Sequence, residues 1–560
     1  MAGGFLNLVA NGNQNIILNG NPTKTFFKAK YAKHTNFGMQ RFRIDYNGLR
    51  TLRLTEESHF EFKIPRYSDL LMDTFIVITL PNIWSPISPP RTEDEQWVGY
   101  DFKWIENIGF ELIKEISISV GGQVLQKYSG SYLRNTINRD ADDTKKKLLN
   151  EMIGNTSEFY DPANSNERNN AYPCAFYTDS VTGAHPSIGS RKLYIPLNSW
   201  FMGSSKVAFP LIALQYNELV INVTMRPIHE LYTVRDVRDH TNLYPYIQPN
   251  YTSNYMQFYR FLQTPPSVEL NAEDYEDKRT LWNADIHLLG TYAFLSDDES
   301  RTMSKQSHSY LVKDVQTYTF KNVTGTKRLE LESNGLVSSW MFYFQRSDIN
   351  LRNEWSNQTN WPYNFQPYNV SFAPAIGNYK YPSYDVSSNY FESYYKNGFG
   401  PGINPNGQNT SLMMTGNYTP QNDKEILKEF GVLLDGNFRE NRMDRGVFEY
   451  IEPYTHSQGS SKDGCYFYNF CLNTDPKEYQ PSGAINMAHF KKVELEVSTI
   501  SPPLDENAEL LTICDDAGNV IGVNKPTWNI YQYNYDFIVH EERFNVINFQ
   551  SGQCALMFAR

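Results

Sequence analysis

Apolar and polar residues alternate along much of this chain in short runs. In one run, Phe42, Ile44 and Tyr46 take every second position. The same spacing recurs within residues 60–64, 116–120, 221–225 and 493–497. Successive side chains of a β-strand point to opposite faces, so this spacing predicts strands that bury one face.

Other apolar runs are continuous, at residues 74–80 and 340–345. Runs of this length are typical of strands buried between two packed layers. Gly121 and Gly122 separate the run 116–120 from a second β-prone stretch. Two glycines in that position predict a β-hairpin, because the tight hairpin turns need positive φ angles.

Helical patterns are few. Asp142 precedes a helical stretch over residues 145–153, and Gly154 follows it, which predicts a helix with a polar N-cap and a glycine just past its end. Residues 423–430, followed by Gly431, predict a second helix. Strands do not alternate with helices of 10–15 residues, so the pattern favours an all-β fold over a parallel α/β fold.

The chain divides into two strand-rich blocks, residues 26–228 and 283–560, joined by a connection over 229–282. An N-terminal arm, residues 1–25, is uncharged up to Lys24. It carries the apolar residues Phe5, Leu6, Leu8 and Val9, which are the candidate contact residues of the arm.

Within the second block, residues 349–423 form an insertion rich in Tyr, Asn, Pro and Gly. Long loops are uncommon in folded domains unless they are functional or disordered, and the aromatic content argues against disorder. A folded surface excursion is therefore expected, either for recognition or as a self-packed loop or subunit contact. The candidate recognition residues are Tyr379, Tyr381, Tyr384 and Tyr390.

Composition supports a β-rich fold and narrows the functions. Among 560 residues there are 39 Tyr and 34 Phe but only 20% charged residues, which excludes global disorder and a coiled coil. The net charge of −11 argues against direct nucleic-acid binding, which normally needs a basic face. Five cysteines are too few, and odd in number, for a disulfide framework.

No pattern of catalysis or metal binding is present. The chain has no Walker A, HExxH or GxSxG motif, and the pairs His229-Glu230 and His540-Glu541 lack the second histidine of a zinc helix. No catalytic residue, cofactor or metal site is predicted. A carbohydrate-binding or hydrolytic β-sandwich stays open as an alternative; it would need convergent carboxylates or an aromatic platform in a cleft.

An ordered set of segments from residue 1 to residue 558 resembles the major capsid proteins of nucleocytoplasmic large DNA viruses. It includes Gly20-Asn-Pro-Thr-Lys-Thr-Phe-Phe-Lys28, Trp104-Ile-Glu-Asn-Ile-Gly-Phe110, Leu193-Tyr-Ile-Pro-Leu197, Pro210-Leu-Ile-Ala-Leu-Gln-Tyr216, Gln480-Pro-Ser-Gly483 and Phe544-Asn-Val-Ile-Asn-Phe-Gln-Ser-Gly552. Residues 335–340 lack the His-Pro usual in the family before the Trp strand, and the insertion 349–423 matches no family segment.

The resemblance implies two tandem eight-stranded antiparallel jelly rolls with long loop insertions and a few short helices. It implies a structural subunit of an icosahedral shell, not an enzyme, and a homotrimer whose six rolls imitate a hexagonal tile. The implied partners are neighbouring capsomers, minor capsid and penton proteins and, through the N-terminal arm, an internal membrane layer. The implied location is the virion capsid, assembled in the host cytoplasm without direct contact to nucleic acid.

Overall fold

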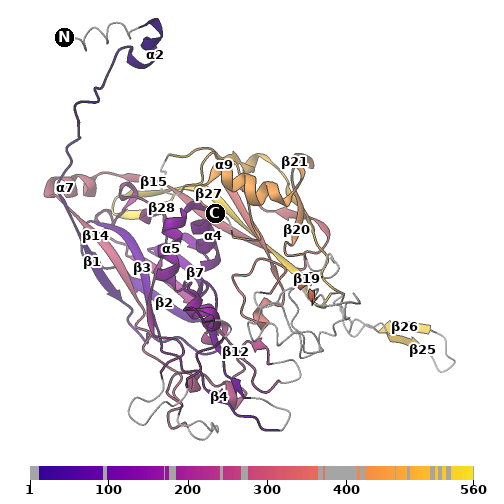
Figure 1. Cartoon of the computed structure of the whole chain (residues 1–560). Coiled ribbons are helices and arrows are strands. Elements are labelled where there is room, and N and C mark those ends of the chain that lie inside the picture. Colours follow the sequence, from indigo (N-terminus) through magenta and orange to yellow (C-terminus); the bar gives the residue numbers. More distant parts are fainter. Residues whose placement is uncertain are drawn as a thin grey trace, which may run out of the picture.

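The computed structural model describes residues 12–92, 97–168, 171–175, 185–239, 244–265, 275–362, 370–372, 413–415, 423–460, 462–475, 480–504, 511–514, 520–524 and 531–558. Strands dominate, and the few helices are short (Figure 1).

The first roll consists of two antiparallel sheets. One has the order β1-β14-β3-β10, with β9 also on β3. Its strands are β1 (Phe37–Asp45), β14 (His287–Leu295), β3 (Leu70–Leu80), β10 (Phe209–Pro210) and β9 (Arg191–Pro196). The facing sheet has the order β2-β11-β7-β8. Its strands are β2 (Ser58–Lys63), β11 (Leu219–Met225), β7 (Ile113–Val120) and β8 (Gln123–Tyr128).

The second roll repeats this plan. One sheet has the order β15-β27-β17-β22, with β23 on β17 and β28 on β27; the other has the order β16-β24-β20-β21. The first of these sheets contains β15 (His308–Phe320), β27 (Tyr535–Gln550), β17 (Leu336–Arg346), β22 (Cys465–Asn469), β23 (Ile485–Asn486) and β28 (Gln553–Leu556). The second contains β16 (Thr326–Leu331), β24 (Val493–Thr499), β20 (Leu427–Leu434) and β21 (Asn437–Asp444).

Smaller elements fill the connections. They are β6 (Phe102–Trp104), β12 (Tyr232–Arg235) and β13 (Tyr246–Ile247) in one small sheet, and the pairs β4 (Ile87–Ser88) with β5 (Val98–Gly99), β18 (Val370–Phe372) with β19 (Met413–Thr415), and β25 (Leu511–Cys514) with β26 (Val520–Asn524). The helices are α2 (Ile16–Asn19), α3 (Ile108–Glu111), α4 (Gly130–Asp140), α5 (Asp143–Ile153), α6 (Ser157–Tyr160), α7 (Asp297–Lys305) and α9 (Glu452–His456), the last preceded by the π-helical turn Val447–Ile451.

The alternating runs behave as their spacing predicts. In β2, Phe60 and Phe62 are buried while Glu61 between them is exposed. The continuous run of β17 is buried from Val337 to Phe344 because the strand lies between β27 and β22 and is covered on both faces. The prediction of strands from these patterns is confirmed.

Two local predictions are also confirmed. Gly121 and Gly122 join β7 to β8 with φ angles of 57° and 85°. The side chain of Asp142 accepts a hydrogen bond from the backbone N–H of Lys145 over 2.8 Å, and α5 ends at Gly154 with φ 73°. Glycine suits these positions because other residues rarely adopt positive φ.

Two expectations are corrected. Residues 423–430 do not form a helix: from Leu427 the chain is strand β20, which pairs with β24 and β21 and buries Phe430. Pairing on both sides outweighs the local helical pattern, as tertiary context often does. Strand β14 lies in the range 283–560 that the sequence assigned to the second roll, yet it is hydrogen-bonded between β1 and β3 of the first.

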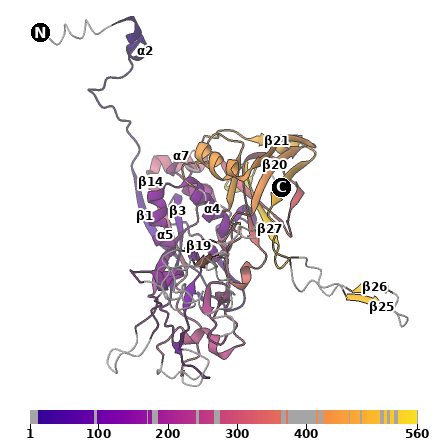
Figure 2. The ribbon, with the colours of Figure 1, turned by 45° about the vertical axis from the view of Figure 1, so that its right-hand side comes forward.

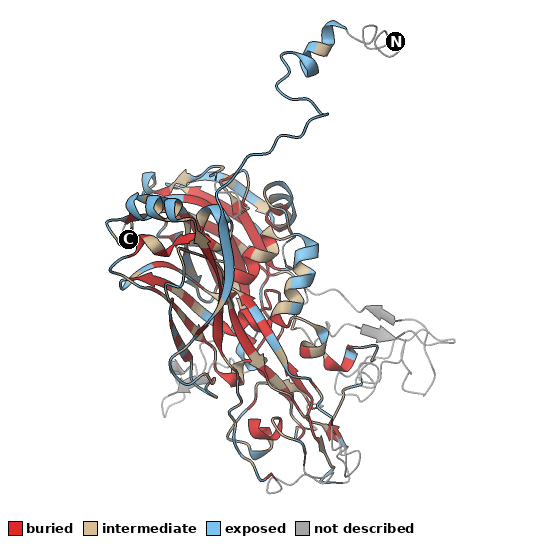
Figure 3. Ribbon diagram, turned by 90° about the vertical axis from the view of Figure 1, so that its left-hand side faces the viewer, coloured by how far each residue is buried: buried red, intermediate tan, exposed pale blue. Residues whose placement is uncertain are grey.

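The two rolls share a hydrophobic core. The larger core cluster contains side chains of the first roll together with Val312, Met341, Phe467, Ile547 and Phe549 of the second. The second roll has a further core of its own around Trp340, Phe342 and Phe537. Buried residues accordingly run through the whole body, whereas residues 12–25 of the N-terminal arm are largely exposed (Figure 3).

Candidate functional sites at the seam between the rolls and in the N-terminal arm

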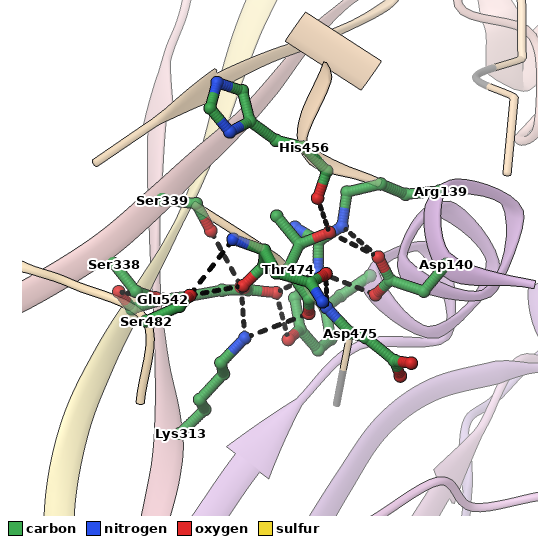
Figure 4. Close-up of polar contacts among 12 residues, drawn as sticks. Arg139, Asp140, Lys313, Ser338, Ser339, His456, Thr474, Asp475, Ser482 and Glu542 are labelled. Atoms are coloured by element: carbon green, nitrogen blue, oxygen red, sulfur yellow. Dashed lines mark hydrogen bonds and ion pairs between the residues drawn. The ribbon is translucent and has the colours of Figure 1, made fainter. Parts of the chain in front are cut away.

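The contact between the rolls, called the seam below, is formed by α4 and β8 on one side and by β15, β17, β27 and residues 456–475 on the other. Glu542 of β27 lies at its centre. Its carboxylate accepts hydrogen bonds from Arg139 (3.0 Å) and Tyr132 (2.8 Å) of α4 and from Ser339 of β17 (2.7 Å). Figure 4 shows Arg139 and Glu542 approaching from different elements.

Arg139 and Glu542 are each only 1% exposed. Burial alone would raise the pKa of Glu542, but the charges of Arg139 and Lys313 and the hydrogen bonds it accepts lower this pKa to about 2. The carboxylate is therefore ionised at neutral pH. A buried charge is tolerated only when it is paired and hydrogen-bonded, so the seam requires both partners.

A second layer of contacts fixes these charges. Arg139 also makes a bidentate contact with Asp140, both distances being 2.9 Å. The hydroxyl of Thr474 donates to Asp140 over 2.7 Å, and the backbone carbonyl of Thr474 accepts from Lys313 over 3.1 Å (Figure 4). Residues from α4, β15 and the loop after β22 are thus joined in one network.

His540, two residues before Glu542, is also buried in the seam, at 1% exposure. Its Nδ1 lies 3.0 Å from the hydroxyl of Thr317, its Nε2 lies 3.4 Å from that of Tyr343, and the Tyr132 ring packs edge-on against it. Burial lowers the pKa of His540 to about 4, so the ring is neutral at neutral pH.

A second point of contact lies beyond β17, in residues 353–360. The side-chain amide of Asn353 donates to the backbone carbonyls of His229 (2.7 Å) and Tyr232 (2.8 Å), in the segment that directly follows the first roll. The indole N–H of Trp355 donates to the carbonyl of Glu230 over 2.9 Å, and the Arg226 guanidinium stacks 4.2 Å from the Trp355 ring. The rolls are therefore joined at two separate places.

The insertion leaves the second roll through a narrow neck. The backbone N–H of Asn360 donates to the carbonyl of Lys424 over 2.8 Å, and the Asn360 side chain donates to that of Asp423 over 2.9 Å. The side-chain oxygen of Asn360 accepts from the hydroxyls of Tyr533 and Tyr535. Asn360 and the residues 423–424 at the end of the predicted insertion are thus held together by contacts that do not involve the residues between them.

Residues 12–36, which include the described part of the N-terminal arm, stand away from the body and lead into β1 (Figure 2). This stretch exposes large apolar side chains, with Ile17 at 81%, Leu18 at 88% and Phe26 and Phe27 fully exposed. The stretch also carries four lysines and no acidic residue. Exposed apolar side chains gathered in one segment are typical of an interaction site.

The residues singled out from the sequence lie outside the described residues. This holds for Phe5, Leu6, Leu8 and Val9 of the arm and for Tyr379, Tyr381, Tyr384 and Tyr390 of the insertion. The seam was not predicted, because Arg139 and Glu542 are 403 positions apart. One signal was present: three consecutive charged residues, Glu541, Glu542 and Arg543, stand within a strand-forming run.

Across the described ranges no group of His, Cys, Asp and Glu side chains is arranged to hold a metal ion. Nor does any helix in the described part of the chain have the length and apolar character needed to cross a membrane.

Comparisons with known proteins agree with this architecture. Residues 25–262 match the family model described as major capsid protein N-terminus, and residues 299–555 match that of the large eukaryotic DNA virus major capsid protein. The major capsid protein of Phaeocystis pouchetii virus is 26% identical over 596 aligned residues that cover all of both chains. That of Paramecium bursaria Chlorella virus 1 is 22% identical, again over all of both chains.

Solved structures show the same fold. The Faustovirus major capsid protein superposes with a TM-score of 0.59 at 12% identity, covering 96% of this chain and 94% of that one. A chain of the PBCV-1 capsid gives a TM-score of 0.56 at 18% identity, covering 96% and 100%.

The pair of packed rolls and these superpositions define a double jelly-roll fold. The two family models together span most of the sequence, and the chain belongs to the family of major capsid proteins of large eukaryotic DNA viruses. It is a structural subunit of the icosahedral capsid and not an enzyme, which sets aside the hydrolytic alternative.

Proposed function

We propose that three copies of this chain form a capsomer in which six jelly rolls approximate a hexagon. The observation that carries the proposal is the core shared by the two rolls, reinforced by the Arg139–Glu542 pair. A tile with six-fold outline needs the two rolls of each copy held at one fixed angle. Two rolls joined by a hydrophobic core and a hydrogen-bonded charge network meet that need, because a packed core deforms little.

Mass measurement tests the trimer. Size-exclusion chromatography with light scattering should give three times 64.9 kDa for the purified chain. A stable monomer across the micromolar range contradicts the proposal, since obligate interfaces of this kind bury large areas and leave little free subunit.

The N-terminal arm is proposed to lie at the inner face of the shell and to contact neighbouring capsomers, minor capsid and penton proteins or an internal membrane layer. Its support comes from the end of the arm and the residues directly after it, where exposed Phe26 and Phe27 are flanked by Lys24 and Lys28, a combination that suits a surface that is partly apolar and partly anionic. Assembly would take place in the host cytoplasm.

Deleting residues 2–20 tests the arm. The variant is expected to remain trimeric, because the described part of this stretch is exposed and lies apart from the core, but to form particles poorly. Normal particles from the variant would show that residues 2–20 are not needed for assembly.

The insertion, with Tyr379, Tyr381, Tyr384 and Tyr390, is proposed to decorate the outer end of the capsomer and to meet host glycans or other virion proteins. The support is its composition and its narrow neck at Asn360, which allows the insertion to vary without change to the roll. Binding of trimers to a glycan array, and its loss when the insertion is trimmed, is the expected result.

A further inference from the structure

The two rolls correspond strand for strand, both in sheet order and in order along the chain. In the first sheet of each roll, β1, β14, β3 and β9 correspond to β15, β27, β17 and β22. In the second sheet, β2, β11, β7 and β8 correspond to β16, β24, β20 and β21. A helical segment follows the edge strand in both: α4 comes after β8, and the π-helical turn with α9 comes after β21. Each side of the seam therefore has a counterpart in the other roll.

The seam brings the helix and edge strand of one roll against the first sheet of the other. Arg139 of α4 reaches Glu542 of β27, and its guanidinium lies 5.9 Å from the ring centre of Phe467 in β22. Beside the helix, β8 meets β15, where the side-chain amide of Gln126 donates to the backbone carbonyl of Lys313 over 2.9 Å. The seam thus joins α4 and β8 to the sheet β15-β27-β17-β22.

The counterpart of α4 in the second roll presents large apolar side chains to solvent. Tyr450, Ile451 and Tyr454 are 61%, 55% and 88% exposed. Leu472, also exposed, adjoins the end of α9, because its carbonyl oxygen lies 3.1 Å from Nδ1 of His456. Tyr450, Ile451, Tyr454 and Leu472 are called the α9 surface below. Aromatic and apolar side chains gathered at one exposed place are typical of a protein interface.

The counterpart of the buried sheet face also carries apolar side chains that solvent reaches. In the second roll, this is the face that bears Glu542 and Met341, which the first roll buries. The same face of the first roll, called the β3 face below, bears exposed or half-buried apolar residues on its four strands: Met39, Phe75, Tyr194 and Leu289. Phe75 and Leu289 are directly paired, so their side chains lie on one face.

The edge strands give a second, independent indication. β1 and β21, the counterparts of β15 and β8, are exposed along most of their length. Exposed edges of this length offer unpaired backbone groups to other chains, and native proteins usually cover them. Within the chain, β15 and β8 are covered because they meet each other at the seam.

The two exposed surfaces lie on opposite sides of the subunit, with β1 on one side and β21 on the other (Figures 1 and 2). Two different surfaces placed in this way join copies head to tail, and such a contact closes into a ring when the rotation between copies divides a full turn evenly. A second copy of the chain therefore suits both surfaces at once, which a partner that matches only one of them does not.

We propose that the α9 surface of one copy packs against the β3 face of the next copy, with β21 beside β1, and so repeats the seam between chains. The proposal rests on the proposed trimer and names the two faces that join its copies. Contacts of one kind would then alternate within and between chains around the ring of six rolls.

Photo-cross-linking of the full chain tests which surfaces meet. p-Benzoylphenylalanine takes the place of Tyr454, and the product of twice the chain mass is digested and sequenced by mass spectrometry. The second peptide is expected to come from β3, β9 or β14. Joining of position 454 to any other segment, or cross-links within one chain only, overturns the proposal. Capture of a different protein at position 454 in intact particles overturns it as well.

Substitutions test the energetic part. Tyr454→Asp and Ile451→Asp on the α9 surface, and Tyr194→Asp on the β3 face, should each raise the concentration at which half of the trimers dissociate by about tenfold or more. The matched controls Tyr216→Asp and Leu351→Asp alter side chains that are 73% and 60% exposed outside both surfaces and should leave this concentration unchanged.

Light scattering over a dilution series in mild urea measures the dissociation, and circular dichroism confirms that each variant is folded. The two proposals fail in different ways. A parent chain that stays monomeric overturns the trimer and this contact with it. A trimeric parent whose Tyr454→Asp, Ile451→Asp and Tyr194→Asp variants dissociate at the same concentration keeps the trimer and overturns the assignment of these faces.

Discussion

The guanidinium of Arg139 donates a hydrogen bond to the carboxylate of Glu542 over 3.0 Å. The two residues are 403 positions apart in the sequence, and both side chains are almost wholly shielded from water. This contact joins a helix of the first roll to a strand of the second. It stands inside a shared core, so that loss of the contact affects both rolls at once.

Replacing Glu542 by Gln should lower the free energy of unfolding by about 3 kcal/mol, because removal of one partner leaves Arg139 and Lys313 with less compensation in a buried place. Chemical denaturation of the trimer measures the loss. The matched control is Glu56→Gln, which breaks the exposed pair Arg53–Glu56 and should cost about 0–1 kcal/mol. Equal effects at the two sites would show that the seam pair contributes no more than a surface pair.

His540 should make stability depend on pH. Its pKa in the folded state, about 4, lies below the 6.5 of an unfolded histidine, so the unfolded chain binds the proton more readily between these values. The contribution of His540 to the free energy of unfolding is therefore fully present above about pH 6.5. It is lost as the pH drops to about 4, by about 3 kcal/mol in total.

The variant His540→Gln, which cannot titrate, should show a flatter fall in unfolding midpoint over this pH window. The surface variant His34→Gln serves as the control and should follow the parent. If the unfolding midpoints of His540→Gln and the parent fell in parallel over this pH range, His540 would not be buried in its neutral form.

Gly459 should not tolerate a side chain. Its N–H donates to the carbonyl of Arg139 over 2.8 Å, and a Cβ would lie 2.4 Å from the carbonyl oxygen of Asn138. Gly459→Ala therefore pushes the second roll away from the end of α4 and should cost about 1–3 kcal/mol. Gly189→Ala is the control, because a Cβ there meets no atom within 4 Å; a similar cost at both positions would refute the close approach.

The insertion should be dispensable for folding. Residues 363–422 can be replaced by a short Gly-Ser linker, because Asn360 already joins its two ends through Asp423 and Lys424. The unfolding midpoint of the shortened chain is expected to equal or exceed that of the parent, since a shorter loop loses less entropy on closure. Failure of the shortened chain to fold would show that the replaced residues are needed for folding.

Asn360→Ala is the opposing variant at the same neck. It leaves the hydroxyls of Tyr533 and Tyr535 without the acceptor they share and should lower the free energy of unfolding by about 2 kcal/mol or more. Chemical denaturation of the two variants under the same conditions distinguishes the contribution of the neck to stability from that of the insertion.

Local elements followed directly from the sequence. Side chains alternate along a strand with a period of two, so the spacing of apolar residues in 60–64 and 221–225 predicted which side of each strand is buried. The glycines at 121 and 122 predicted the turn between two strands. Asp142 and Gly154 marked the two ends of a helix. The ordered segments that resemble the capsid protein family predicted the two tandem jelly rolls.

The tertiary structure decided what depends on residues far apart in sequence. Residues 427–430 became a strand because β24 and β21 offered backbone partners on both sides, which a local pattern cannot register. Strand β14 joined the first roll for the same reason. Arg139 and Glu542 could not be paired from the sequence, since the free energy of a buried ion pair depends on burial and geometry, and these exist only once both rolls have packed.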